Sequence, residues 1–202
     1  MDSMHLEANN SPFLWALGRN VLPVECTKAL VAYLDHFGAW VPSKSAIARN
    51  SAYYLNSQEI LTPPGLRIAV ATLTPSIEAS VASAFKIEAL TTSQVMLNRW
   101  LPGDYAHPHT DAMGDPSNPH YFSHRALLYL TPTEKQLAGG DLVLHGASEL
   151  DPTTRRIRPD CNTLAALAMS PESVHSVDKI VSGTRYSIVW SLRPSTTDRN
   201  VS

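Results

Sequence analysis

The sequence predicts a mainly β protein, with supporting α-helices ahead of an antiparallel sandwich or open barrel. From about Thr92 onward, short apolar segments alternate with a period of two and are separated by turns rich in Pro, Gly and Asp. No helical pattern is interleaved with these segments, so the connections fit an antiparallel arrangement. Before Thr92, two segments carry apolar residues at helical spacing instead.

Two helices are expected in the first half of the chain. The first follows Pro23, a residue that suits the first turn of a helix, and it stops at Gly38. The second is expected to begin with Thr74 as its N-cap, just before Pro75. Its apolar stripe consists of Ile77, Val81, Ala84 and Phe85. The stretch 42–65 between the two helices is expected to be a loop.

Six strands are expected in the second half: Val95–Trp100, Ala126–Thr131, Asp141–His145, Leu164–Met169, Val174–Lys179 and Arg185–Leu192. The last of them has two contrasting faces. One face is apolar and suited to packing on the helices: Tyr186, Ile188, Trp190 and Leu192. The other carries Arg185, Ser187, Val189, Ser191 and Arg193, and it lines either solvent or a cavity.

Composition excludes several classes of protein. The 202 residues are 44% hydrophobic and 17% charged, which is typical of one folded domain. A formal charge of −2 disfavours nucleic acid or an anionic membrane as the main partner. Only Cys26 and Cys161 occur, which argues against a disulfide scaffold and favours a reducing compartment. We see neither a signal peptide nor an apolar run of about 18 residues, so a cytoplasmic protein is expected.

The strongest chemical signal is a set of metal ligands in two distant segments. His109 and Asp111 are two residues apart, so on an extended chain both side chains leave the same face. His175, on a later expected strand, is the best third ligand. Two imidazoles and one carboxylate form a facial triad for non-haem Fe(II), with positions left open for a co-substrate and oxygen.

Such an iron site needs an electron donor, and 2-oxoglutarate is a good candidate. Its distal carboxylate requires a cation, and Arg185 lies ten residues after His175. The planar guanidinium can bind that carboxylate bidentately. Ser187, on the same strand face, can add a hydroxyl hydrogen bond.

These residues belong to a longer series of matching motifs between Val95 and Leu192. The series is Arg99–Gly103, His109-Thr-Asp111, Arg125–Leu130, Gly139–Leu142, His175–Val177 and Gly183–Trp190. On these motifs the chain resembles the Fe(II)/2-oxoglutarate-dependent dioxygenases of the prolyl 4-hydroxylase-like branch. The resemblance implies a double-stranded β-helix, that is, a jelly-roll or cupin-like barrel. A single domain 1–202 would then comprise a helical support region, 1–92, and a catalytic core, 93–195.

The resemblance also implies roles for individual residues. His109, Asp111 and His175 would bind Fe(II), Arg185 would bind 2-oxoglutarate with help from Tyr129, and O2 would be the second co-substrate. Trp100 stands where many relatives have a tyrosine, so it would either wall the pocket or donate through its indole nitrogen. The expected reaction is hydroxylation, or desaturation or cyclisation. Halogenation is disfavoured because Asp111 occupies the position that a halide would need.

The substrate is expected to be a small molecule, such as an amino acid or a natural-product intermediate. The segment Ala112–Arg125 is a candidate lid, and Tyr121, His124 and Arg125 are candidate substrate contacts. A prolyl or other residue within a protein is the alternative substrate.

Two other classes of protein stay open. One is a cupin-type metalloenzyme that uses His107, His109 and His175 without 2-oxoglutarate. The other is a non-catalytic ligand-binding jelly-roll in which His109 and Asp111 are incidental. The sequence gives no indication of the oligomeric state.

Overall fold

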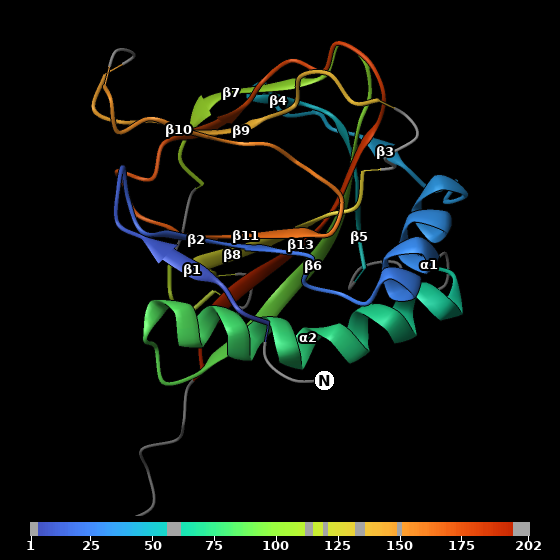
Figure 1. Cartoon of the computed structure of the whole chain (residues 1–202), viewed down its shortest axis with the longest axis horizontal. Coiled ribbons are helices and arrows are strands. Elements are labelled where there is room, and N and C mark those ends of the chain that lie inside the picture. Colours follow the sequence, from blue (N-terminus) through green and yellow to red (C-terminus); the bar gives the residue numbers. More distant parts are fainter. Residues whose placement is uncertain are drawn as a thin grey trace, which may run out of the picture.

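The computed structural model describes residues 4–55, 62–111, 115–118, 121–131, 136–148 and 151–195. Within these ranges, two antiparallel sheets face each other, and two helices cover the outer side of the larger sheet (Figure 1). The predicted fold class, a mainly β jelly-roll supported by helices, is therefore confirmed.

The two sheets draw on strands from both halves of the chain. The large sheet has the order β1 (Glu7–Asn9), β2 (Trp15–Arg19), β11 (Thr163–Ala168), β8 (His124–Tyr129), β13 (Arg185–Pro194), β6 (Leu90–Trp100), β5 (Ser51–Tyr54) and β3 (Val41–Pro42). The small sheet has the order β10 (Arg155–Ile157), β9 (Leu142–Leu144), β12 (His175–Val177), β7 (Tyr105–His109) and β4 (Ala48–Arg49). All six expected strands are present.

The first half of the chain contains strands that the sequence did not predict. The stretch 42–65, expected to be a loop, contains β4, β5 and the end of β3. The region 1–92 is therefore more than a helical support, because five of its strands extend the two sheets. Strands of two to four residues are too short to show a period of two in the sequence.

The helices agree in place but not in extent. Helix α1 (Val24–Asp35) lies where it was expected, directly after Pro23. Helix α2 (Pro64–Phe85) begins well before Thr74, so the prediction of its start was wrong. Pro64 occupies the first turn, where a missing N–H has no cost. Pro75 lies inside the helix, and the Thr74 hydroxyl donates to the Val70 carbonyl at 2.8 Å instead of capping.

Helix α2 is long and apolar enough, by length and composition alone, to cross a membrane, a feature that the sequence prediction does not include. Core helices pass the same test, and nine of its side chains are buried in the protein. The seven apolar ones form a single buried cluster with side chains of α1 and the apolar face of β13, so the predicted orientation of that strand is confirmed. Two polar contacts fix the layers: the Trp190 indole N–H donates to Thr74 at 2.9 Å, and the Tyr186 hydroxyl donates to Asp35 at 3.1 Å.

The inner faces of the two sheets pack on each other through two smaller apolar clusters. One cluster joins β2, β8 and β11 to β9 and β10, with Trp15 and Tyr129 among its members. The other contains Trp100, Ala106, Val177 and Ile180. A cavity lies between the sheets and is lined by residues of both, including Tyr54 from the N-terminal half.

Candidate active site

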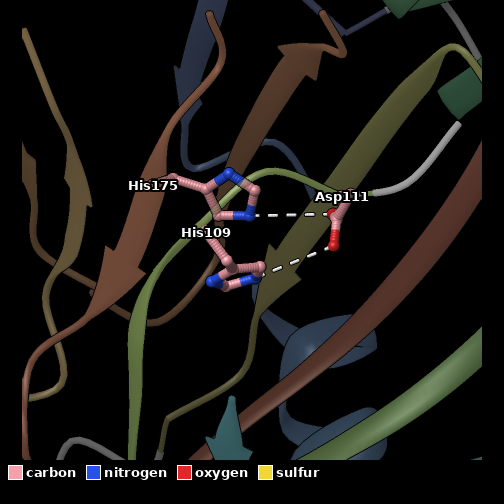
Figure 2. A group of neighbouring side chains, drawn as sticks. All are labelled: His109, Asp111 and His175. Atoms are coloured by element: carbon pink, nitrogen blue, oxygen red, sulfur yellow. Dashed lines mark ion pairs between the residues drawn. The ribbon is translucent and has the colours of Figure 1, made fainter. Parts of the chain in front are cut away.

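The pairing of β7 with β12 brings the two histidines together. His109 and His175 are direct cross-strand partners, and their ring centroids are 4.5 Å apart. Asp111 follows the end of β7, and its carboxylate faces both rings (Figure 2). Asp111 Oδ1 is 3.7 Å from His109 Nε2, and Asp111 Oδ2 is 3.6 Å from His175 Nε2. The three ligand atoms lie within 4.8 Å of one another, a spacing that a single metal ion can bridge.

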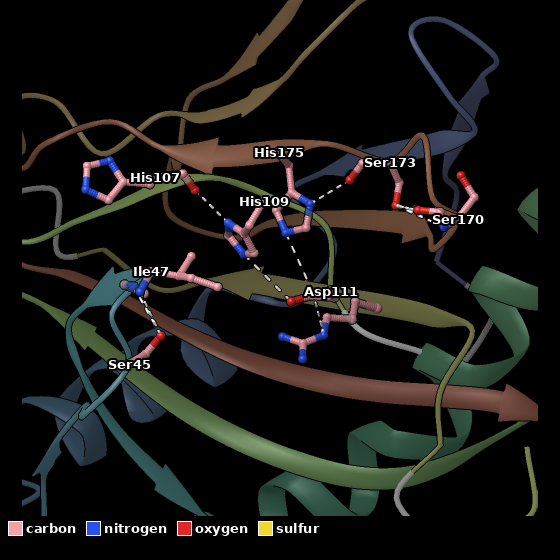
Figure 3. Close-up of polar contacts among 10 residues, drawn as sticks. Ser45, Ile47, His107, His109, Asp111, Ser170, Ser173 and His175 are labelled. Carbon is pink, nitrogen blue, oxygen red and sulfur yellow. Dashed lines mark hydrogen bonds and ion pairs between the residues drawn. The ribbon is translucent and has the colours of Figure 1, made fainter. Parts of the chain in front are cut away.

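Both imidazoles are held in the form that binds a metal. The Nδ1 atom of His109 lies 2.7 Å from the His107 carbonyl, and that of His175 lies 2.9 Å from the Ser173 carbonyl (Figure 3). A carbonyl only accepts, so each Nδ1 carries a proton, and each Nε2, which faces Asp111, is the nitrogen left to bind a metal. Burial lowers the pKa of His175, although the nearby Asp111 charge acts in the opposite direction. The lowered pKa keeps the His175 ring neutral. The donor set therefore fits Fe(II).

The triad borders a cavity of about 350 Å³ between the sheets. Arg185, at the start of β13, lines the same cavity and is only 1% exposed. Its Nε and one terminal nitrogen have no hydrogen-bond partner among the described residues. An unpaired buried guanidinium is costly, so the structure prepares this position for an anion. The distal carboxylate of 2-oxoglutarate matches that requirement.

Two aromatic rings hold the guanidinium in place. Its central carbon lies 5.2 Å from the Trp100 ring centroid and 4.9 Å from that of Tyr129. Trp100 thus walls the pocket, and its indole N–H, like the Tyr129 hydroxyl, is buried without a partner in the described chain. Burial raises the pKa of Tyr129, with the Arg185 charge acting in the opposite direction, so the phenol is neutral and can donate. Ser187 lies directly opposite Tyr129 in the sheet and also lines the cavity.

The paired glycines Gly139 and Gly140 allow the chain to enter β9 beside this arginine. Both have positive φ angles, of 75° and 78°. A Cβ atom on Gly140 would lie 2.4 Å from the Ile180 side chain and 3.4 Å from Arg185 Cδ. Glycine is therefore required both by conformation and by space.

The three candidate substrate contacts have different positions. Arg125 lines the cavity, and its Nε lies 3.0 Å from the Asp111 carboxylate. His124 faces the other way, towards α2, with its ring 5.5 Å from that of Phe85, so its expected contact with substrate is not supported. Neighbouring residues of a strand point to opposite faces, so the two could not both reach the cavity. Tyr121 is not among the residues that line it.

Part of the expected lid lies outside the described residues, namely 112–114 and 119–120. The cupin-like alternative is weakened by the position of His107. Its side chain is exposed and points away from the triad (Figure 3), although its backbone carbonyl orients His109.

Other lining residues were missed in the sequence. Asn98 and Met96 lie two and four positions before Trp100 on β6 and share its face, so a period of two counted back from Trp100 would have identified them. Residues between Ser43 and Tyr54 also line the cavity. They come from short strands and a turn that carry no recognisable signal.

The comparisons with known proteins agree with this geometry. Residues 95–192, which contain the triad and Arg185, match the model of the 2OG-Fe(II) oxygenase superfamily. Residues 95–192 are a 2OG-Fe(II) oxygenase domain. Oxygenases of this family use Fe(II), 2-oxoglutarate and O2, as predicted. Curated protein sequences give no match.

Solved structures that resemble the oxygenase extend the likeness to most of the chain. A prolyl-4-hydroxylase from Pseudomonas putida superposes with a TM-score of 0.67 and 18% identity, covering 90% of this chain and 93% of its own. A 2OG-Fe(II) oxygenase family oxidoreductase from Burkholderia pseudomallei gives 0.67 and 13%, covering 90% and 85%. A prolyl hydroxylase from Trichoplax adhaerens, solved with a hypoxia inducible factor peptide fragment, gives 0.60 and 17%, covering 89% and 83%. At these identities the superpositions show the shared prolyl hydroxylase-like fold.

Proposed function

We propose that this oxygenase hydroxylates an unactivated C–H bond of a small molecule and releases succinate and CO2. The observation that carries the proposal is the convergence of the metal triad and the unpaired Arg185 on one cavity. When bound, Fe(II) and 2-oxoglutarate supply the oxidising chemistry, and the protein supplies placement and the exclusion of water.

Each side chain has a defined task in this proposal. His109, Asp111 and His175 would hold the iron at the wall of the cavity. Arg185 binds the distal carboxylate of the co-substrate, and the Tyr129 hydroxyl donates a further hydrogen bond. Ser187 and Trp100 complete the wall around the same group.

The cavity supports a small substrate. Its volume of about 350 Å³ is near the lower end of the range for small-molecule sites, and the co-substrate takes up part of it. Apolar side chains contribute much of the lining: Met96, Leu127, Leu142, Val177 and Val189. A compact molecule with an apolar body fits such a space.

The first experiment tests the two cofactors together. Under anaerobic conditions, Fe(II) and 2-oxoglutarate should produce a weak metal-to-ligand charge-transfer band with the wild-type protein. Arg185→Met should need a much higher 2-oxoglutarate concentration to reach the same band. If wild type gives no band, the cupin-type or non-catalytic alternatives gain support.

A residue within a peptide is the second candidate substrate. It is favoured by the likeness to prolyl hydroxylases, one of them solved with a peptide fragment, and by exposed apolar side chains that line the cavity. Ile47 is 45% exposed and Tyr54 is 43% exposed. Screening amino acids, other small acids and proline-containing peptides for stimulated succinate release separates the two substrate classes.

A further inference from the structure

We propose that Arg125 binds a carboxylate of the substrate, so that this oxygenase acts on small carboxylic acids with an apolar body. The inference rests on the proposed function, because it concerns the substrate side of the same cavity. It starts from a side chain that the binding of iron and 2-oxoglutarate does not require.

Arg125 is placed and oriented by its surroundings. It lies on the cavity face of β8, and its side chain is 22% exposed. The guanidinium carbon lies 4.5 Å from the Phe122 ring centroid, and Nε lies 3.0 Å from Asp111. No other hydrogen bond or ion pair involves Arg125 among the described residues. Within the described part of the chain its two terminal nitrogens are therefore free of partners, and they form a planar fork beside the metal ligands, the geometry that matches a carboxylate.

The charges that line the cavity point to the same ligand. Among the described residues that line the cavity, Asp111 is the only acidic one, whereas Arg125 and Arg185 are both cationic. Fe(II) and 2-oxoglutarate carry opposite charges of equal size, so binding both of them leaves the net charge of the cavity unchanged. One positive charge in the cavity then stays uncompensated. A carboxylate on the substrate would neutralise it.

The neighbours of Arg125 define the rest of the molecule. Leu127 follows it on the same face of β8, and Val177 and Met96 line the same cavity. A substrate with its carboxylate on Arg125 would thus lay an apolar body along these side chains. An internal residue of a peptide has no backbone carboxylate to offer, so the proposal favours free acids over peptides.

Arg125 could instead have a purely structural role, the orientation of Asp111, and the experiment must distinguish that role from binding of the substrate carboxylate. The separation uses matched ligands that differ only in charge: 3-phenylpropanoate against 3-phenylpropanamide, and N-acetyl-L-leucine against its amide. A defect in the metal site weakens both members of a pair, whereas a lost carboxylate contact weakens only the acid.

The experiment is oxygen-free calorimetric titration of these four compounds into full-length protein loaded with Mn(II) and 2-oxoglutarate. For wild type, the acids should bind about tenfold or more tightly than their amides. Arg125→Met should bring the acid-to-amide ratio close to one, and Arg125→Lys should restore part of it. Arg158→Met, which removes a cation that is exposed on the surface, should keep the wild-type ratio.

Two outcomes would overturn the proposal. One is that no acid binds more tightly than its amide. The other is that Arg125→Met weakens acid and amide equally, which would make Arg125 a positioning residue for Asp111. Failure of the proposed function is recognised separately, because then Fe(II) and 2-oxoglutarate give no charge-transfer band with wild type.

Discussion

The two faces of the central strands β8 and β13 have different roles. On the face towards the helices, Leu128, Ile188 and Trp190 are fully buried, and the one polar atom of that group, the indole nitrogen, has a hydrogen bond. On the face towards the cavity, Arg185 and Tyr129 are equally buried, but polar atoms of both lack partners in the described chain. The first face stabilises the fold, whereas the second retains binding capacity that ligands satisfy.

The largest effect on activity is expected from replacing the metal ligand Asp111 on the cavity side. Replacing Asp111 with Ala removes the carboxylate that faces both imidazoles, so 2-oxoglutarate-dependent succinate release should fall to the level of a no-enzyme control. Asp178→Ala, which breaks the surface ion pair with Arg156, is the matched control and should keep its activity. Turnover retained by Asp111→Ala would refute the assignment of the metal ligands.

The next prediction concerns the co-substrate anchor. Arg185→Met should raise the Kd of 2-oxoglutarate by about 30-fold to 1,000-fold, the usual cost of removing one partner of a buried charged pair. The melting temperature of the unliganded protein should not fall, because the variant removes a buried cation that lacks partners. Titration of the charge-transfer band and thermal melting measure the two effects. A large loss of stability with unchanged 2-oxoglutarate affinity would make Arg185 a structural residue.

The opposite pattern is expected on the helix side. Leu128→Ala removes a fully buried side chain between the sheet and the helices, which should lower the free energy of unfolding by about 2–5 kcal/mol. The Kd of 2-oxoglutarate should stay within about twofold of wild type, well under 1 kcal/mol. Urea unfolding and the same spectral titration test this pair of outcomes. If Leu128→Ala instead weakened 2-oxoglutarate binding as strongly as Arg185→Met, the two faces would not be separable.

The sequence predicted those parts of the fold in which one residue pattern is repeated over several turns or pairs. In β13, for example, the alternation of side chains from Arg185 to Leu192 is sufficient to identify both faces of the strand. Helix α2 shows the limit: Pro75 reads as a helix start, yet burial of the apolar side chains on both sides of it outweighs the hydrogen bond that it removes. Strands β4 and β5 depend on pairing with distant strands and leave no local pattern.

The site divides in the same way. His109, Asp111, His175 and Arg185 could be proposed together because their residue types and spacing match one chemistry. The orientation of Arg125 and His124 was harder to predict, because the sequence does not reveal which residue of an adjacent pair faces the cavity. The register of β8 with β13 decides it: Leu192, on the helix face, is opposite His124, and Ser191 is opposite Arg125.

His124 provides the smallest test of the comparison, since it is next to Arg125 on β8 but lies on the opposite face. Burial against the helices lowers the pKa of His124 to about 4, so the ring is neutral in the folded protein at pH 5. An unfolded chain, with an ordinary histidine pKa of about 6.5, takes up a proton there. The stability from this group is complete above about pH 6.5 and is lost as the pH falls towards 4, by at most about 3 kcal/mol.

His124→Leu should therefore lose less stability than wild type between pH 7.5 and pH 5, measured by urea unfolding of the metal-free protein. His36→Gln, which alters an exposed histidine at the end of α1, should keep the wild-type dependence. Burial of His175 also lowers its pKa and adds to the same loss in all three proteins, so the difference between His124→Leu and wild type isolates the helix face. Identical losses would mean that His124 is protonated in the folded state and that the helix face tolerates a charge.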